Sequence, residues 1–216
     1  MTGTGTEVGK TVVAATIARQ LAEEGRRVGV FKPAVTGLDD FAADGPDHLV
    51  LRQAAGSAQS DEEIAPYRYG PPMSPHLAAE LAGEEIEPAR LLSAARDAAA
   101  GADTLVCEGV GGFLVPLTRD YLVRDLAAEL ALPLVIAASP GLGTINHTLL
   151  TLEAARGAGL EVAAVILTPW PEEPSAIERS NRETIAALGE ARVETLPPLD
   201  LCRPESWPKL GDLPMG

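Results

Sequence analysis

The amino-acid sequence predicts an α/β fold with a mostly parallel central sheet that is flanked by helices on both faces. Short runs rich in Val, Ile and Leu alternate along the chain with longer stretches whose apolar residues recur three and four positions apart. Strands separated by a helix pair in parallel, and the helices cover the faces of the sheet. Because no internal repeat and no linker interrupts this alternation, we expect residues 1–216 to form a single domain.

Four apolar runs predict the strands, since continuous hydrophobicity is typical of strands buried on both faces. They are Arg27–Phe31, Thr104–Cys107, Leu132–Ala138 and Val162–Leu167. Helical periodicity predicts six helices. They are Lys10–Glu24, Asp47–Ala55, Pro88–Ala99, Val123–Leu130, Asn146–Ala158 and Ser175–Leu188. The proline-rich tail from Pro197 carries no clear pattern.

The composition argues against several classes of protein. Hydrophobic residues make up 46% of the chain and charged residues 22%, which fits a globular domain with a full core. The 31 acidic and 17 basic residues give a formal charge of −14, and no basic run occurs, so we expect no nucleic-acid partner. No apolar stretch is long enough to predict a membrane span. Two cysteines indicate no disulfide framework, and we expect a reducing, cytoplasmic setting.

The strongest functional motif is the segment Gly3–Thr11, with the sequence GTGTEVGKT, directly before the first predicted helix. Five residues separate Gly3 and Gly9, one more than the strict phosphate-loop pattern allows. The glycines still let successive N–H groups face one anion, and the helix adds its positive end. Lys10 is placed to bridge the β- and γ-phosphates, and Thr11 to bind Mg²⁺. We therefore predict a P-loop NTPase-like domain that binds a nucleoside triphosphate; a plain glycine-rich turn is the less favoured alternative.

The start of the chain departs from the usual arrangement. A phosphate loop normally follows a buried strand, but only Met1 and Thr2 precede Gly3. We therefore predict that the N-terminal strand is largely missing from this sequence and that the sheet has a gap. A version extended upstream by about six residues, a typical strand length, is expected to be more stable.

Two further motifs end predicted strands, at the edge where open α/β sheets bind ligands. Lys32 follows the run Arg27–Phe31, with Pro33 and then Thr36-Gly37 after it. Glu108 follows Thr104–Cys107 and is succeeded by three glycines within four residues. An acid in this position suits a Mg²⁺ ligand. The alternatives are a solvated lysine at a strand end and an ordinary flexible turn.

Two weaker motifs open helices. Asp47 precedes a helical run, and a helix N-cap is a good explanation for it. The turn Gly141–His147 lies between a predicted strand and a helix, where backbone N–H groups can hold a carboxylate or phosphate. An ordinary strand-to-helix turn explains this segment equally well.

Taken in order, these segments resemble the dethiobiotin synthetases. The resemblance is carried by Thr2–Thr11 with its longer spacing, Lys32-Pro33 with Thr36-Gly37, Ser74-Pro75-His76, Glu108–Gly112 and Leu142–His147. It spans most of residues 2–168. It implies an ATP- and Mg²⁺-dependent enzyme that makes dethiobiotin from 7,8-diaminopelargonate and CO₂ or bicarbonate. It also implies a homodimer whose subunits share active sites.

The resemblance assigns roles residue by residue. Lys10 and Lys32 are implied to be catalytic, and Thr11, Asp47 and Glu108 to hold the metal. The substrate is implied to contact Thr36, Gly143, Ile145 and Asn146. The nucleotide is implied to contact Thr6, Glu7, Val8, Gly9, Lys10, Thr11, Val12, Asp47, Glu108, Gly109, Val110, Gly111, Thr168, Pro197, Pro198 and Leu199.

Two positions depart from the family pattern. Many members have an adenine-reading asparagine after the strand that corresponds to Val162–Leu167, where this chain has Thr168. Selectivity for the base is therefore expected to be looser. Val110 stands where alanine is more usual, which is a mild change.

Other functions compete with this interpretation. A chromosome-partitioning or division-site ATPase would carry a second lysine early in the phosphate loop, but Lys10 is the only lysine there. A cobyrinate synthetase of the amidotransferase type would need a glutaminase domain. A truncated, inactive nucleotide-binding relative is the third alternative, and only the missing strand supports it.

Overall fold

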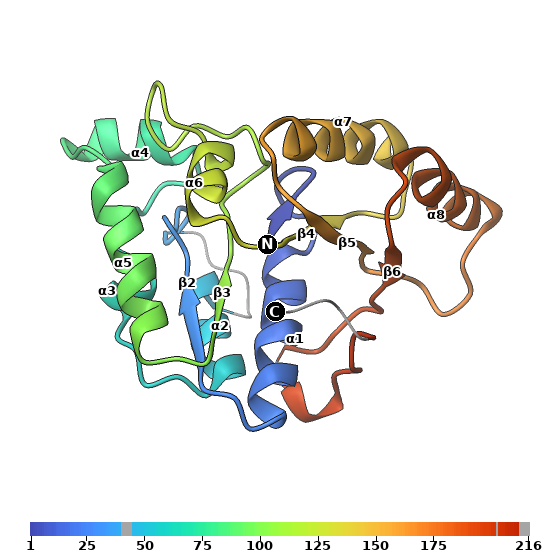
Figure 1. Ribbon diagram of the computed structural model, residues 1–216, viewed down its shortest axis with the longest axis horizontal. Coiled ribbons are helices and arrows are strands. Elements are labelled where there is room, and N and C mark those ends of the chain that lie inside the picture. Colours follow the sequence, from blue (N-terminus) through green and yellow to red (C-terminus); the bar gives the residue numbers. More distant parts are fainter. Residues whose placement is uncertain (40–44, 202, 212–216) are drawn as a thin grey trace.

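The computed structural model describes residues 1–39, 45–201 and 203–211 and shows the expected α/β architecture. Its strands are β1 (Thr2–Gly3), β2 (Val28–Phe31), β3 (Thr104–Cys107), β4 (Leu134–Ala138), β5 (Val162–Leu167) and β6 (Val193–Thr195). All the pairings between these strands are parallel. Helices lie around the strands on both faces (Figure 1). The predicted fold class is therefore confirmed.

The described ranges contain eight α-helices and one short 3₁₀ helix, which follows the last strand. The long ones are α1 (Lys10–Glu23), α2 (Asp47–Ala55), α5 (Pro88–Ala100), α7 (Thr144–Gly157) and α8 (Ala176–Gly189). The shorter ones are α3 (Asp61–Ile64), α4 (Pro75–Ala82), α6 (Val123–Leu130) and the 3₁₀ helix η1 (Pro204–Ser206). No helix in the described part of the chain combines the length and the hydrophobicity that crossing a bilayer requires.

The sheet is divided into two ladders. One has the order β1-β4-β5-β6, and the other contains only β2 and β3. The first strand is reduced to two residues, with Thr2 opposite Ile136 and Gly3 opposite Ala137. A strand this short cannot extend alongside β3, so the ladder is interrupted between β3 and β4. The gap expected from the sequence is present.

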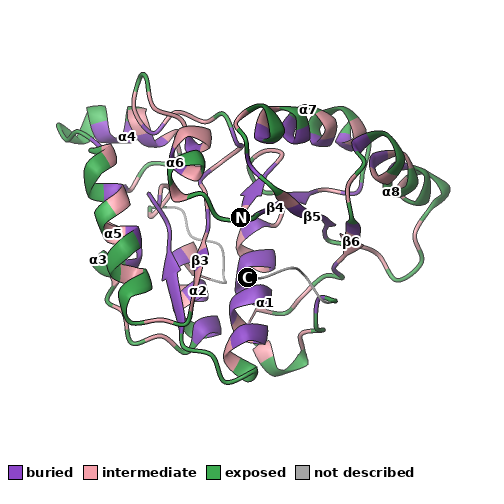
Figure 2. Cartoon of the chain, viewed as in Figure 1, coloured by how far each residue is buried: buried purple, intermediate pink, exposed green. Residues whose placement is uncertain are grey.

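Helix α1 joins the two halves of the molecule. It packs against both β3 and β4 and makes its largest helix contact with α2 (Figure 1). Its core-facing residues, among them Val13, Ile17 and Leu21, are 0–6% exposed. In Figure 2 the buried colour follows β2, β4 and α1, and the outward faces of α5 and α8 are exposed. One helix thus replaces part of the packing that a continuous sheet would supply.

Several elements differ from the sequence-based expectation for local reasons. Strand β4 begins at Leu134, two residues later than predicted, because Pro133 has no N–H for the ladder. Helix α7 begins two residues earlier, at Thr144, because Gly143 adopts the left-handed conformation that starts it. Helices α3 and α4 and strand β6 were not expected. Each spans only three to eight residues, too few for a clear period.

Helix α5 packs so closely against β2 that a side chain at Gly29 would collide with it, and this close packing can be tested. A Cβ on Gly29 would lie far inside van der Waals contact with the Ala98 carbonyl oxygen, whereas a Cβ on Gly101 would meet nothing within 4 Å. We expect Gly29→Ala to lower the free energy of unfolding by about 1–3 kcal/mol, because α5 must move. Gly101→Ala is the matched control and is expected to change it little. Urea denaturation measures both, and equal midpoints would contradict the close approach.

Candidate functional site

The phosphate-loop segment curls tightly between β1 and α1. Gly9 starts α1 with φ 85° and ψ 22°, and Glu7 also has a positive φ, 58°. A Cβ on Gly9 would lie 2.5 Å from the Thr168 methyl group, so both conformation and space require glycine. A Cβ on Gly3 would lie 2.6 Å from Val8. Loops of this kind turn successive backbone N–H groups toward one point, where an anion can bind.

Lys10 lies across this loop. Its Nζ donates a 2.7 Å hydrogen bond to the carbonyl oxygen of Gly5, and the residue is only 8% exposed. Burial lowers the pKa of Lys10, and the negative charge of Glu108 partly opposes the shift. The first residue of α1 thus places its amino group over the concave side of the loop, as a phosphate-binding lysine requires.

Next to the loop, three elements bring one ammonium group and two carboxylates together. Lys32 follows β2, and its Nζ lies 2.6 Å from Glu108 Oε1 and 2.8 Å from Asp47 Oδ2. Glu108 follows β3 and is fully buried, whereas the Asp47 side chain is 44% exposed. Thr11 Oγ1 donates to the same Glu108 oxygen at 2.8 Å. We call Thr11, Lys32, Asp47 and Glu108 the carboxylate–lysine cluster.

The electrostatics of the cluster keep Lys32 charged. Burial disfavours the ammonium form, but Glu108 and Asp47 outweigh burial and raise the pKa of Lys32. The pKa of Asp47 is lowered, because Lys32 outweighs the effect of its burial. Burial, with repulsion from Asp47, raises the pKa of Glu108 against the opposing effect of Lys32. A single ammonium therefore balances two carboxylates that compete for it.

The structure decides between the two explanations of Asp47. Pro46, not Asp47, is the N-cap of α2, and no side chain caps that helix end. The Asp47 carboxylate instead binds Lys32. The helix-cap explanation is therefore wrong, and Asp47 belongs to the cluster.

One oxygen of the cluster has no partner: Glu108 Oε2 is buried and makes no hydrogen bond. Together with Asp47 and the Thr11 hydroxyl it offers the hard oxygen donors that Mg²⁺ prefers. In the described ranges, no three His, Cys, Asp or Glu side chains gather closely enough to hold a metal by themselves. The residues therefore fit a Mg²⁺ ion that also takes ligands from phosphate and water.

The glycine-rich segment after Glu108 approaches the phosphate loop. A Cβ on Gly112 would lie 3.6 Å from the Cα of Gly5, and Gly111 has a φ of 60°. The Gly109 N–H donates to the Met1 carbonyl oxygen at 2.9 Å. The segment that holds the candidate nucleotide contacts Gly109–Gly111 is thus held beside the beginning of the chain and of the phosphate loop. Gly5 and Gly112 therefore lie close together, as the glycine-rich motifs at Gly3–Thr11 and after Glu108 allow.

The remaining predicted site residues make no hydrogen bond or ion pair with the cluster in the part of the chain that the structure describes. Thr168 is buried beneath Gly9, and its N–H donates to the Ala138 carbonyl oxygen at 2.9 Å. Thr36 lies four residues beyond Lys32 and is half-buried. No hydrogen bond or ion pair in the described residues links the cluster to Gly143, Ile145 and Asn146, or to Pro197, Pro198 and Leu199.

The turn that precedes α7 is nevertheless held in place by hydrogen bonds from α8. Asn181 of α8 is buried, and its amide nitrogen donates to the carbonyl oxygens of Pro140 and Gly141 at 2.9 and 3.1 Å. These bonds fix the turn that leads into Gly143. No sequence pattern signals this role, because Asn181 lies some forty positions away from the turn.

Comparisons with known proteins agree with this geometry. Residues 1–206 match a sequence family described as an AAA domain. An ATP-dependent dethiobiotin synthetase of Bacillus subtilis subsp. natto is 38% identical over 87% of this chain and 81% of its own length. One from Rhodococcus erythropolis (strain PR4 / NBRC 100887) is 41% identical over 87% of this chain and 82% of its own length.

Solved structures with a similar fold include the Pyrococcus horikoshii septum site-determining protein MinD in complex with Mg-ADP. It has a TM-score of 0.51 and 16% identity, over 91% of this chain and 79% of its own. An Archaeoglobus fulgidus nucleotide-binding protein in complex with ADP has a TM-score of 0.51 and 18% identity, over 97% of this chain and 91% of its own. At this identity the likeness concerns the fold.

The parallel sheet, the curled loop before α1 and the lysine across it define a P-loop nucleotide-binding protein. Within that class, the identity to the Bacillus and Rhodococcus proteins over most of both chains decides the family. The chain belongs to the ATP-dependent dethiobiotin synthetases, and the resemblance seen in its motifs is confirmed.

The cluster leads to a prediction about stability. Lys32→Met leaves the buried Glu108 carboxylate without its counter-charge, and we expect the free energy of unfolding to fall by about 3 kcal/mol. The double variant Lys32→Met/Glu108→Gln removes both charges and is expected to recover part of that loss. Urea denaturation measures both variants.

The control for the Lys32 and Glu108 variants is an ion pair of similar length on the surface. Arg27 Nη2 lies 2.7 Å from Asp103 Oδ1, and the two side chains are 71% and 46% exposed. We expect Arg27→Met to change the stability little, because solvent screens an exposed pair. Similar losses for Lys32→Met and Arg27→Met would contradict a special role for the buried charge.

Proposed function

We propose that the enzyme forms dethiobiotin from 7,8-diaminopelargonate, CO₂ and ATP, with Lys10 and Lys32 as its catalytic cations. The observation that carries this proposal is the carboxylate–lysine cluster beside the phosphate loop. It provides a charged amino group that is buried, fixed by two carboxylates and close to Thr11 at the start of α1. The identity of the relatives supports the same reaction.

The reaction needs charge neutralisation more than covalent catalysis. One amine of the substrate takes up CO₂ as a carbamate. A carbamate oxygen then attacks the γ-phosphorus of ATP, which expels ADP and leaves a carbamic–phosphoric anhydride. The second amine attacks the carbonyl carbon, closes the cyclic urea and expels phosphate. Both transfers move negative charge between oxygens, so positioned cations and N–H donors lower the barrier.

The chain's own groups divide this work. Lys10 and the backbone N–H groups of residues 6–12 bind the phosphate oxygens. Lys32 lies on the carbamate side, where it stabilises the attacking oxygen, and Thr36 orients the amines. The burial of Lys32 strengthens these interactions, because little water competes for its charge.

Thr11, Asp47 and Glu108 would hold Mg²⁺, since they combine the required oxygen donors with a buried oxygen that lacks a partner. The bound ion would supply positive charge to the phosphate oxygens. Lys32 contacts both carboxylates in this structure. When Mg²⁺ is bound, Asp47 and Glu108 would therefore interact with the ammonium group and with the ion at the same time.

The base of the nucleotide is expected near Thr168 and Pro197–Leu199. Thr168 is fixed beneath Gly9, and Pro197 and Pro198 are exposed. Neither proline has a side-chain donor or acceptor, so among these residues only the Thr168 hydroxyl can add a side-chain hydrogen bond to what backbone groups and shape provide. Weak discrimination between nucleoside triphosphates follows from this set of residues.

We further propose a homodimer in which α7 of one subunit completes the site of the other. The substrate carboxylate lies several methylenes from the amines, so it needs a second anion site. The backbone N–H groups at Gly143, Ile145 and Asn146 provide one at a helix N-terminus. The adjoining Leu142 is 97% exposed, which suits a contact with a second subunit. A two-fold axis would build both sites together.

ADP release should depend on both co-substrates. We expect the rate to fall at least tenfold when either the diamine or bicarbonate is omitted, because the attacking carbamate oxygen then does not exist. A coupled ADP assay measures it. Lys32→Ala, checked by calorimetry for binding of a nonhydrolysable ATP analogue, is the inactive control. Rapid ATP hydrolysis without the diamine would instead favour a nucleotide-switch ATPase.

Shared sites should show complementation between two inactive variants. Lys10→Ala disables the phosphate side, and Gly143→Glu repels the substrate carboxylate. In a mixed dimer one site carries both defects and the other neither. Refolding an equal mixture should restore activity at about a quarter of all sites, given random pairing. Each variant refolded alone should stay inactive. No recovery from dimers confirmed by light scattering would mean that each subunit builds its own site.

A further inference from the structure

The Lys32 ammonium group is held by acceptors of the protein itself. Its Nζ lies 2.6 Å from Glu108 Oε1 and 2.8 Å from Asp47 Oδ2, with the Gly109 carbonyl oxygen at 3.5 Å. An ammonium group has three N–H donors, and these three acceptors match their number. The Lys32 side chain is 2% exposed, so little water can replace any of the three contacts.

The carboxylates that we assign to Mg²⁺ are engaged in these internal bonds. Glu108 Oε1 accepts from both Lys32 and the Thr11 hydroxyl, and Asp47 Oδ2 pairs with Lys32. Of the two Glu108 oxygens, Oε2 is the one without a partner. A divalent cation that used Asp47 and Glu108 would therefore have to share both carboxylates with an ammonium group that already contacts them.

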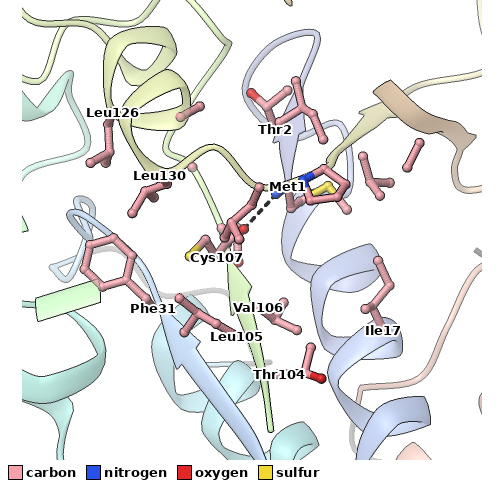
Figure 3. A pocket seen from close by; sticks show the side chains of 18 of the residues that line it. Met1, Thr2, Ile17, Phe31, Thr104, Leu105, Val106, Cys107, Leu126 and Leu130 are labelled. Atoms are coloured by element: carbon pink, nitrogen blue, oxygen red, sulfur yellow. Dashed lines mark hydrogen bonds between the residues drawn. The ribbon is translucent and has the colours of Figure 1, made fainter. Parts of the chain in front are cut away.

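Two further amino groups act on Glu108 through their charge without pairing with it. Those of Lys10 and Met1 donate to backbone carbonyl oxygens at 2.7 and 2.8 Å, and Figure 3 shows the second of these bonds. In the described part of the chain, Lys32 is the only cation within ion-pair distance of Asp47 or Glu108. The two carboxylates thus depend on one ammonium group for their direct counter-charge.

This single counter-charge changes what the site can bind. Without Lys32, Asp47 and Glu108 would present two uncompensated carboxylates, which attract a divalent cation strongly where little water competes. With Lys32 in contact, one of the two negative charges is balanced, and the ion must also approach an ammonium group at short range. The phosphates of a nucleotide bring further negative charge, which offsets that repulsion.

We propose that Lys32 acts as the counter-ion of Asp47 and Glu108 while no nucleotide is bound, and that it thereby keeps their affinity for a free divalent cation low. Metal binding then depends on the phosphate charges that accompany a nucleotide. This regulation of the site rests on the proposed function, in which Thr11, Asp47 and Glu108 hold Mg²⁺. It gives Lys32 a role before any substrate is present, in addition to its proposed contact with the carbamate.

Titration with Mn²⁺ in the absence of nucleotide tests this role. Mn²⁺ takes the same kinds of oxygen ligand as Mg²⁺, and electron paramagnetic resonance measures its free concentration. Lys32→Gln removes the charge but keeps a side chain that can form hydrogen bonds. We expect this variant to bind one Mn²⁺ at least about tenfold more tightly than the unmodified chain. Adding Glu108→Gln should abolish the gain, because the freed carboxylate is then missing.

The matched control is Lys10→Gln. It removes one positive charge from another buried lysine, whose amino group bonds to Gly5 and not to the carboxylates. Weak binding of Mn²⁺ to the acidic surface therefore affects both single variants equally. We expect Lys10→Gln to raise the affinity for Mn²⁺ by less than about threefold, because its charge acts from a greater distance.

Melting temperatures give a second readout, which is informative even if Lys32→Gln is poorly stable. Loss of the ammonium group leaves the Glu108 carboxylate without its counter-charge, and a divalent cation should replace part of it. We expect about 10 mM Mg²⁺ to raise the melting temperature of Lys32→Gln by about 3 °C or more. The unmodified chain should gain less than half as much.

The outcomes separate this inference from the proposed reaction. Equal affinities of the unmodified chain and Lys32→Gln for Mn²⁺, or an equal gain in Lys10→Gln, would overturn the inference and leave the reaction in place. An unmodified chain that binds Mn²⁺ equally well with and without a nonhydrolysable ATP analogue would do the same. Failure of the reaction is seen in a different measurement, as ADP release that does not need the diamine.

Discussion

The contact between the Lys32 ammonium and the carboxylates of Glu108 and Asp47 holds the candidate site together. The three groups come from the end of β2, the end of β3 and the start of α2. Thr11 adds the first turn of α1 through its hydrogen bond to Glu108. A charge this deeply buried persists only beside its counter-charge. The cluster therefore fixes the positions of four elements relative to one another.

This electrostatic link matters because no ladder joins β3 to β1, the strand from which the phosphate loop leaves. The β2–β3 ladder carries Lys32 and Glu108, whereas the phosphate loop leaves from β1, which pairs only with β4. Helix α1 packs across both halves, and Lys10 and Thr11 lie at its first turn. Lys10 and Lys32, the two lysines that we propose to be catalytic, thus follow strands of different ladders. Helix packing, the ionic cluster and the hydrogen bonds of Met1 with Cys107 and Gly109 set the distance between them.

The sequence predicted those parts of the site that depend on local pattern. The strands ahead of Lys32 and Glu108 are short, continuous and apolar, and the loop before Lys10 is rich in glycine, so their positions in the fold followed. The role of Asp47 could not be decided, because a helix cap and a charged partner call for the same residue type. Asn181 was not recognised, since its bonds to Pro140 and Gly141 depend on how α8 packs. Such long-range contacts leave no periodic signal.

The burial of Lys10 and Lys32 has a consequence for how substrates arrive. The chain has a formal charge of −14, and both lysines are at most 8% exposed. An approaching anion is therefore expected to be repelled by the acidic surface, most strongly at low ionic strength, where salt does not screen the surface charges. Attraction begins only at the mouth of the site. Long-range electrostatics are thus expected to slow the encounter with ATP, and added salt, which screens the repulsion, is expected to speed it up.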